Sequence, residues 1–285
     1  METRSKTAVR LRDMVVGDLV QAHVLSRAAQ WPHRLEDWQF LLQLGQGVVA
    51  EQDGAIVGTA MGWPFGPHAA TLGMVIVSPE CQGGGVGRKL MNAIIEHLGD
   101  RTIMLNATDV GLPLYKSLGF ETVGTVYQHQ GAAFTVSLPL LGRGERIRPM
   151  GSGDRAAVFD LDRRAMGMPR EKLVTALQSG ARGVVLDRDG EALGFALFRR
   201  FGRGHVVGPT VAPDIDGAKA LISHWLGSNT GMLIRLDVSE AGGLSGWLET
   251  LDLTCVGRVT TMVRGTPLKH DDAIRTFALV SQALG

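Results

Sequence analysis

The residues best suited to chemistry lie in a glycine-rich stretch in the first half of the chain. Val75 to Pro79 is a β-rich run that leads into Gln82-Gly83-Gly84-Gly85-Val86-Gly87-Arg88 and then into an amphipathic helical pattern. Glycines let backbone N–H groups approach a ligand without a Cβ in the way, and the start of a helix favours negative charge. Arg88 adds a cation there. This order predicts a binding site for a pyrophosphate.

The spacing of the glycines separates three classes of phosphate loop. A Walker loop counted from Gly83 reaches Arg88-Lys89-Leu90, which lacks the hydroxyl that would bind magnesium. A dinucleotide fingerprint started at Gly83 or Gly85 ends on Arg88 or Leu90, where it requires glycine or alanine. The pattern that matches without a gap is Gln-x-x-Gly-x-Gly preceded by Val-x-Pro.

This segment resembles the coenzyme A loop of the GNAT superfamily of N-acetyltransferases. A second segment, Leu114-Tyr115-Lys116-Ser117-Leu118-Gly119-Phe120, is similar to the family's later Leu-Tyr-x-x-x-Gly-Phe motif and follows in the expected order. The resemblance implies acetyl-CoA, or another acyl-CoA, as the cofactor. The residues that it places against the cofactor are Val75 and Val77 through their backbone, Gln82, Gly83, Gly84, Gly85, Val86, Gly87 and Arg88 of the loop, and Thr108, which stands where many relatives have an asparagine.

The resemblance also implies candidates for proton transfer. Tyr115 occupies the position of the tyrosine that commonly protonates the coenzyme A thiolate; the alternative is an aromatic side chain that packs its short helix onto the sheet. Many relatives carry a basic glutamate where this chain has Gly73. We therefore consider His68, just before the β-rich run, as a catalytic base, against the alternative of a surface-loop histidine. His33 and His129 are further candidates.

The acceptor is expected to be a primary amine of a small molecule or peptide, acylated in a direct ternary complex. Trp31, Trp63 and Phe65 could line its site, although tryptophans more often fill cores. Cys81 has no identified base partner and is interpreted as packing material, not as a nucleophile. The alternative function is a non-catalytic protein that senses acyl-CoA and regulates or binds a partner, which would need the loop but not Tyr115.

The same pattern occurs twice along the chain. Residues 11–18 resemble 147–154, and residues 48–54 resemble 184–190, each of the latter pair ending in Asp-Gly, which favours a hairpin turn. The alternative is two unrelated domains that share turn dipeptides. The repeat divides the chain into domains 1–141 and 142–285, and it resembles a tandem subgroup with an intact first GNAT domain and a divergent second one. The second copy has Asp214-Ile215-Asp216-Gly217 in place of the loop, so one cofactor site per chain is expected.

The predicted fold class is α/β (α+β), with two tandem GNAT-like domains that each contain a mixed, mostly antiparallel sheet flanked by helices. A weak helical pattern covers 271–284, and Pro169 is expected at a first helical position. Expected helices cover 18–28, 35–44, 86–98, 112–118 (with Gly119 as the C-cap) and 217–226. Expected strands cover 48–51, 55–61, 71–77, 102–107, 121–127, 132–138, 183–186 and 192–198.

Composition narrows the partners. Lys and Arg total 29 against 28 for Asp and Glu, and no long run of one sign suggests a nucleic-acid or membrane-binding arm. The two cysteines have neither metal-ligand nor redox spacing, so no metal site is expected. The chain shows no signal-like apolar region after its basic start and no apolar run near 18 residues, which predicts a cytoplasmic protein. Two tandem units could mimic the family's dimers within one chain, so a monomer or a homodimer is expected.

Overall fold

The computed structural model describes residues 8–132, 136, 139 and 141–285. The first half contains β1 (Arg10–Asp13), α1 (Leu19–Ala28), α2 (Leu35–Leu44), β2 (Gln46–Gln52), β3 (Ala55–Phe65), β4 (Ala69–Val77), α3 (Val86–Leu98), β5 (Thr102–Ala107), α4 (Leu112–Ser117) and β6 (Glu121–Ala132). The second half contains β7 (Glu145–Pro149), α5 (Arg155–Met166), α6 (Glu171–Gln178), β8 (Ala181–Arg188), β9 (Glu191–Phe201), β10 (Gly204–Ala212), α7 (Ile215–Ser228), β11 (Leu233–Ser239), α8 (Ser245–Glu249), β12 (Thr254–Arg264) and β13 (Arg275–Ala278).

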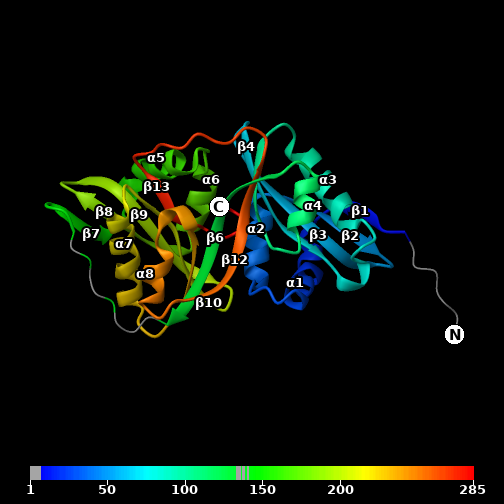
Figure 1. Ribbon diagram of the computed structural model, residues 1–285, viewed down its shortest axis with the longest axis horizontal. Coiled ribbons are helices and arrows are strands. Elements are labelled where there is room, and N and C mark those ends of the chain that lie inside the picture. The colour runs from blue at the N-terminus through cyan, green and yellow to red at the C-terminus, as the bar shows by residue number, and fades with distance from the viewer. Residues whose placement is uncertain (1–7, 133–135, 137–138, 140) are drawn as a thin grey trace.

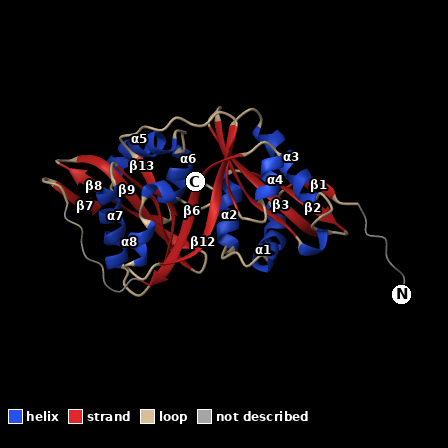
Figure 2. Cartoon of the chain, viewed as in Figure 1, coloured by secondary structure: helices blue, strands red, loops and turns tan. Residues whose placement is uncertain are grey.

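The strands described form one continuous sheet in the order β1-β2-β3-β4-β5-β12-β6-β11-β13-β10-β9-β8-β7. Only the pairs β4–β5 and β10–β11 are parallel, so the sheet is mixed and mostly antiparallel, as predicted. Helices cover both of its faces (Figure 2). In the part of the chain that the structure describes, no helix is both long enough and apolar enough to cross a bilayer.

The two halves exchange strands at the centre of the sheet. β12, from the second half, pairs with β5 on one side and β6 on the other, and β6 in turn pairs with β11. β6 and β12 therefore run side by side through the middle of the molecule (Figure 1). Each half of the sheet is completed by a strand from the other half, so the sequence boundary near residue 141 does not separate two independent sheets.

The internal repeat extends to individual ion pairs. Arg12 donates two hydrogen bonds to Asp18, at 2.7 and 2.8 Å, and Arg148 donates two to Asp154 at 2.8 and 2.7 Å. Both carboxylates also accept a hydrogen bond from a backbone N–H at the start of the following helix. In each half the arginine lies on the first strand and the carboxylate lies at the start of the helix that follows. The ion pair therefore holds this helix in the same position relative to the strand in both halves.

The two Asp-Gly hairpin turns also form as predicted. Asp53 and Gly54 have φ values of 52° and 80°, and Asp189 and Gly190 have 53° and 92°. Positive φ at both central positions is the type I′ geometry, which matches the twist of the flanking strands.

Two predicted elements are wrong and one falls mostly outside the described residues. The helix expected over 271–284 does not form. The segment instead contains the short strand β13, whose buried residues Phe277 and Ala278 lie in the sheet between β10 and β11, and is otherwise made of turns and irregular structure. Pro169 lies before α6, since Arg170 has a non-helical backbone and the helix begins at Glu171. Of the strand expected over 132–138, only Ala132 lies in a strand, as the last residue of β6. Most of the remaining positions lie outside the described residues.

One apolar core is shared by both halves. It packs α1 and α2 of the first half, including Trp38, together with α5 and α6 of the second half, including Val158 and Leu173, and with the buried residues Val280 and Leu284. Separate cores lie beneath α3 in the first half and beneath α7 in the second. The shared core means that the halves are joined by packing as well as by strand exchange.

Candidate active site

The strands β4 and β5 separate part-way along their length. Their parallel register runs from Ala69 opposite Thr102 to Leu72 opposite Leu105 and then ends. Met74 has a φ of 53°, and the β3–β4 register shifts at the same level. The Thr59 hydroxyl donates to the Met74 carbonyl at 2.7 Å and holds this bend. As a result the backbone of 73–77 turns away from β5 and leaves an opening in the sheet.

The glycine loop lies at the end of β4 and leads into α3. Gly83 and Gly85 have φ values of 78° and 77°, and Gly85 is the N-cap of the 13-residue helix α3. A Cβ added at either glycine would meet nothing within 4 Å, so glycine is required here by backbone conformation and not by packing. The Gln82 side chain donates to the Val77 carbonyl at 3.0 Å and ties the loop to the strand.

A cavity of about 600 Å³ connects the end of β4, the loop and α4. It is lined by the predicted residues Val75, Val77, Gln82, Gly83, Gly85, Val86, Gly87, Arg88, Thr108 and Tyr115, together with Ala29, Trp31, Ile76, Cys81, Val110, Gly111 and Leu114. The structure therefore brings together all but one of the residues expected to contact the cofactor; Gly84 is in the loop but is not part of this lining.

Tyr115 lies on α4 with only 8% of its surface exposed. Its ring packs so closely on Gly111 that a Cβ at that position would be 2.7 Å from the ring, and it meets Phe120 edge to face. Burial raises the pKa of the Tyr115 phenol to about 12. The hydroxyl therefore stays protonated at neutral pH and can act as a proton donor in this cavity.

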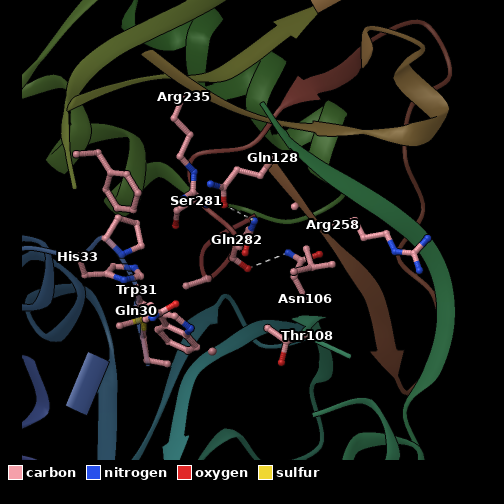
Figure 3. Close-up of a pocket in the computed structure, with 17 residues that line it drawn as sticks. Gln30, Trp31, His33, Asn106, Thr108, Gln128, Arg235, Arg258, Ser281 and Gln282 are labelled. Atoms are coloured by element: carbon pink, nitrogen blue, oxygen red, sulfur yellow. Dashed lines mark hydrogen bonds between the residues drawn. The ribbon is translucent and has the colours of Figure 1, made fainter. Parts of the chain in front are cut away.

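A second cavity, of about 270 Å³, lies between the two halves (Figure 3). The first half contributes residues of the α1–α2 connection, the bend of β4, the end of β5 and β6, and the second half contributes β9, β11, β12 and the segment after β13. Trp31 and Thr108 line both cavities, so the two adjoin. The remaining lining residues are Gln30, Pro32, His33, Gly73, Met74, Asn106, Gln128, Phe201, Arg235, Gly257, Arg258, Val259, Ser281, Gln282 and Ala283.

Both halves of the chain match a known family. Residues 43–122 match one model of the acetyltransferase (GNAT) domain, and residues 158–277 match a second model of the same description. Together these matches span more than half of the chain. The chain belongs to the GNAT family of acetyltransferases. It is thus an acyltransferase with two GNAT units in tandem.

Full-length relatives agree with this assignment. The chain is 28% identical over 286 residues to an uncharacterised N-acetyltransferase, YitH, from Bacillus subtilis, covering 95% of this chain and 99% of the relative. In fold it is similar to a putative acetyltransferase from Pyrococcus horikoshii, with a TM-score of 0.81 at 18% identity over 100% of this chain and 99% of that one. It is also similar to a tandem GNAT protein from the clavulanic acid biosynthesis pathway, with a TM-score of 0.65 at 15% identity over 92% of this chain and 100% of that one.

In the second GNAT unit a strand, β13, lies in the position that corresponds to the opening between β4 and β5 of the first unit. β10 and β11 are parallel like β4 and β5, but their direct register covers only His205 and Val206, and beyond it β13 inserts between them. In addition, the carboxylate of Asp214 accepts a hydrogen bond from the Gly217 N–H at 2.8 Å and so caps α7. Backbone and carboxylate thus occupy the places that correspond to the opening and to the start of α3 in the first unit.

The acetyltransferase does not bring the candidate base His68 to either cavity. His68 is exposed at the first end of β4, where its carbonyl accepts the Thr102 N–H, whereas the glycine loop follows the other end of this nine-residue strand. His129 is fully buried and bonded to Ser245 and to the Leu253 carbonyl, at 2.8 Å each, which is a packing role. Of the three candidate histidines, His33 alone lines a cavity.

Of the three aromatic residues that were expected to line the acceptor site, one lines the two cavities described above and two do not. Trp31 lines both cavities. Trp63 is fully buried and donates to the Leu41 carbonyl at 2.9 Å, and Phe65 is buried and lines a different cavity. Cys81 borders the cavity of about 600 Å³, and its thiol lies 3.6 Å from the Gln52 amide oxygen. An amide supplies no base for the thiol.

Sequence reasoning missed the part of the site that follows β13. A Cβ on Gly73 would be 3.0 Å from the Cβ of Ala283, so Ala283 occupies the space that a side chain at position 73 would need. The Asn106 amide donates to the Gln282 carbonyl at 2.8 Å and holds this segment in place. The absence of the glutamate common in relatives thus has a steric reason, which no local pattern in the sequence could reveal.

His33 makes a testable contribution to acid stability. Burial, followed by the nearby charge of Arg235, lowers the pKa of its imidazole to about 4. Between pH 6.5 and 4 the unfolded chain therefore binds a proton at this residue that the folded protein does not, so the free energy of unfolding falls as the pH falls through this window, by up to about 3 kcal/mol. Urea unfolding at pH 7 and pH 4.5 should show a smaller loss in His33→Gln than in the exposed control His270→Gln; equal losses would refute this role.

Proposed function

We propose that the enzyme transfers an acetyl or other short acyl group from acyl-CoA to a primary amine of a small molecule or peptide. The observation that supports this most directly is the convergence of three features on one cavity: the opening between β4 and β5, the glycine loop at the start of α3, and the Tyr115 side chain. The adjoining smaller cavity provides a separate place for the amine, which favours direct transfer within a ternary complex.

The residues present fit coenzyme A. The open side of the glycine loop and the N-terminus of α3 suit its pyrophosphate, because backbone N–H groups and the helix dipole both favour an anion there. Arg88, which borders the cavity and donates to the Ser117 hydroxyl at 2.8 Å, adds positive charge. Val75 and Val77, on the free edge of β4, would hold the pantetheine arm. When bound, the thioester of acyl-CoA supplies the activated acyl group.

Tyr115 would donate one of the protons that the reaction transfers, and water would accept the other. The protonated phenol of Tyr115 lines the coenzyme cavity and would donate its proton to the departing thiolate. Among the described residues that line either cavity there is no Asp or Glu. The acceptor amine would therefore arrive neutral or lose its proton to water.

Calorimetric titration with acetyl-CoA tests the coenzyme site. The native protein should bind about one molecule per chain, and Gly85→Glu should lose this binding, because its side chain and negative charge would enter the pyrophosphate position. Gly190→Glu is the matched control, since Gly190 also has positive φ and open space beyond it but lies in the β8–β9 turn of the second half. Absence of binding to the native protein, or equal loss in both variants, would contradict the proposed site.

A thiol-release assay then separates catalysis from sensing. With acetyl-CoA saturating, the protein should release free coenzyme A thiol only when a suitable amine is added. Binding of acetyl-CoA without thiol release from any amine would instead indicate an acyl-CoA-sensing protein.

A further inference from the structure

The smaller cavity contains polar side chains that lack partners. The Ser281 hydroxyl and the His33 Nδ1 are buried and have no hydrogen-bond partner among the described residues, although both residues line the cavity. Ser281 is only 4% exposed. Buried polar atoms are almost always paired, so these two groups point to a ligand that can hydrogen-bond with them.

The charged side chains near the cavity do not balance. Arg34 pairs with Asp37 at 2.7 Å, and Arg235 pairs with Asp237 at 2.8 Å, so each of these arginines has its own carboxylate. Arg199 has no carboxylate within ion-pair distance among the described residues; its Nη2 donates to the Val280 carbonyl at 2.9 Å, its Nη1 donates to the Arg200 carbonyl at 3.4 Å, and its Nε is unpaired. One buried positive charge is therefore left without a counterion.

This excess charge lies against the cavity wall. The guanidinium groups of Arg199 and Arg235 lie 4.9 and 5.4 Å from the centre of the Phe201 ring, which lines the cavity. Burial lowers the pKa of Arg199 only to about 10, so it remains charged at neutral pH. In an interior of low dielectric constant, such a charge favours an anionic ligand and disfavours a polycationic one.

The side chains that line the two ends of the cavity differ. Arg235 and Ser281 lie on one side, and Thr108, which also borders the coenzyme cavity, lies on the opposite side (Figure 3). The Arg258 guanidinium is directed away from Gln282 and Asn106, so it adds no charge at the centre (Figure 3).

We propose that the acceptor is a small amine that also carries a carboxylate, such as an amino acid. Its carboxylate binds between Ser281, His33 and Arg235, and its amine lies toward Thr108 and the coenzyme cavity. This inference rests on the proposed function. One unbalanced positive charge matches a monocarboxylate better than a doubly charged phosphate, and a volume of about 270 Å³ limits the acceptor to a small molecule.

An acceptor panel tests the inference. Thiol release would be measured with the proteinogenic amino acids, with their carboxamides, and with phosphoethanolamine, at saturating acetyl-CoA. We expect at least one amino acid to exceed its own carboxamide by about 10-fold or more in kcat/KM, as for a ligand whose loss leaves buried polar groups unpaired. This order runs against intrinsic reactivity, because the amine of a carboxamide is less basic and is more often neutral. Carboxamides that react equally well, or a preference for phosphoethanolamine, would overturn the proposal.

Variants of the cavity identify the residues that discriminate. Ser281→Ala and Arg235→Lys should each lower the ratio of kcat/KM for the acid to that for the amide by about 5-fold or more, mainly through KM for the acid. Lysine at position 235 keeps a cation opposite Asp237. Ser223→Ala is the matched control, because the Ser223 hydroxyl is also buried and unpartnered but lies on α7, away from the cavity. An unchanged ratio in the two cavity variants, or an equal fall in the control, would refute the assignment.

Failure of this inference can be told from failure of the proposed function. The preferred acid and its amide would also be titrated calorimetrically against the protein saturated with coenzyme A, which measures acceptor binding without turnover. Absence of acetyl-CoA binding to the native protein would contradict the coenzyme site itself. Transfer to amides and acids alike, with acetyl-CoA binding intact, would contradict only the carboxylate assignment.

Discussion

Exchange of Tyr115 for phenylalanine is expected to lower kcat by about 100-fold or more, the usual range for loss of a positioned general acid. The change removes one hydroxyl and keeps the ring that packs against Gly111 and Phe120, so the fold and the coenzyme cavity should persist. The dissociation constant for acetyl-CoA, measured by calorimetry, should stay within a few-fold of the native value. Thiol release at saturating substrates gives kcat.

Tyr127 supplies the control, since it is the other tyrosine of the chain. Its hydroxyl donates to Glu240 at 2.9 Å on the surface of β6, away from both cavities, so Tyr127→Phe should leave kcat nearly unchanged. A Tyr115→Phe protein with native kcat would show that the residue only packs its helix, and a parallel loss of acetyl-CoA affinity would show a binding role in place of proton donation.

Removal of the Arg170 side chain is expected to destabilise the protein by about 3–5 kcal/mol, the cost of leaving a buried charge without its partner. Arg170 and Asp162 are essentially fully buried, and the guanidinium donates to both carboxylate oxygens, at 2.9 and 2.6 Å. The same guanidinium donates to the carbonyls of Leu284 and Gly285 at 3.1 and 3.0 Å, so it also holds the end of the segment whose residues 281–283 line the smaller cavity. Urea unfolding of Arg170→Ala measures the loss.

An exposed ion pair on α5, the helix that carries Asp162, provides the comparison. Arg163 pairs with Asp160 at the surface, where such a pair contributes at most about 1 kcal/mol, so Arg163→Ala should shift unfolding little. The double variant Asp162→Leu with Arg170→Met should recover much of the stability that Arg170→Ala loses, because it leaves no unpaired charge. Similar losses in Arg163→Ala and Arg170→Ala would mean that the buried pair has no special importance.

The sequence allowed prediction of those features that depend on neighbouring residues. The glycine loop, the Tyr115 helix and the Asp-Gly turns are each determined by backbone preferences over a few positions, and the structure places the loop and Tyr115 on one cavity. The two GNAT units were visible because the repeat preserves local patterns such as the Arg12 and Arg148 strands and the turns that follow.

The features that could not be predicted depend on contacts between distant parts of the chain. A strand such as β12 has the same alternating pattern whichever half it joins, so the exchange with β6 leaves no mark in the sequence. β13 was mistaken for a helix because its apolar residues also fit a helical period over a short run. The placement of Ser281 opposite His33 depends on the whole shared core, and only the unexpected Gly73 hinted that another segment lies there.

The exchange of β6 and β12 also determines when this enzyme can mature during its synthesis. On the ribosome, β1 to β5 emerge early, but the neighbour of β5 is β12, which is made roughly 150 residues later. Until then the edge of β5 remains open, and an open edge can pair with another nascent chain. Residues 281–283, which line the smaller cavity, are made later still. The first half can thus acquire its glycine loop long before it has a closed sheet, and the smaller cavity, which both halves line, exists only after the second half has been translated.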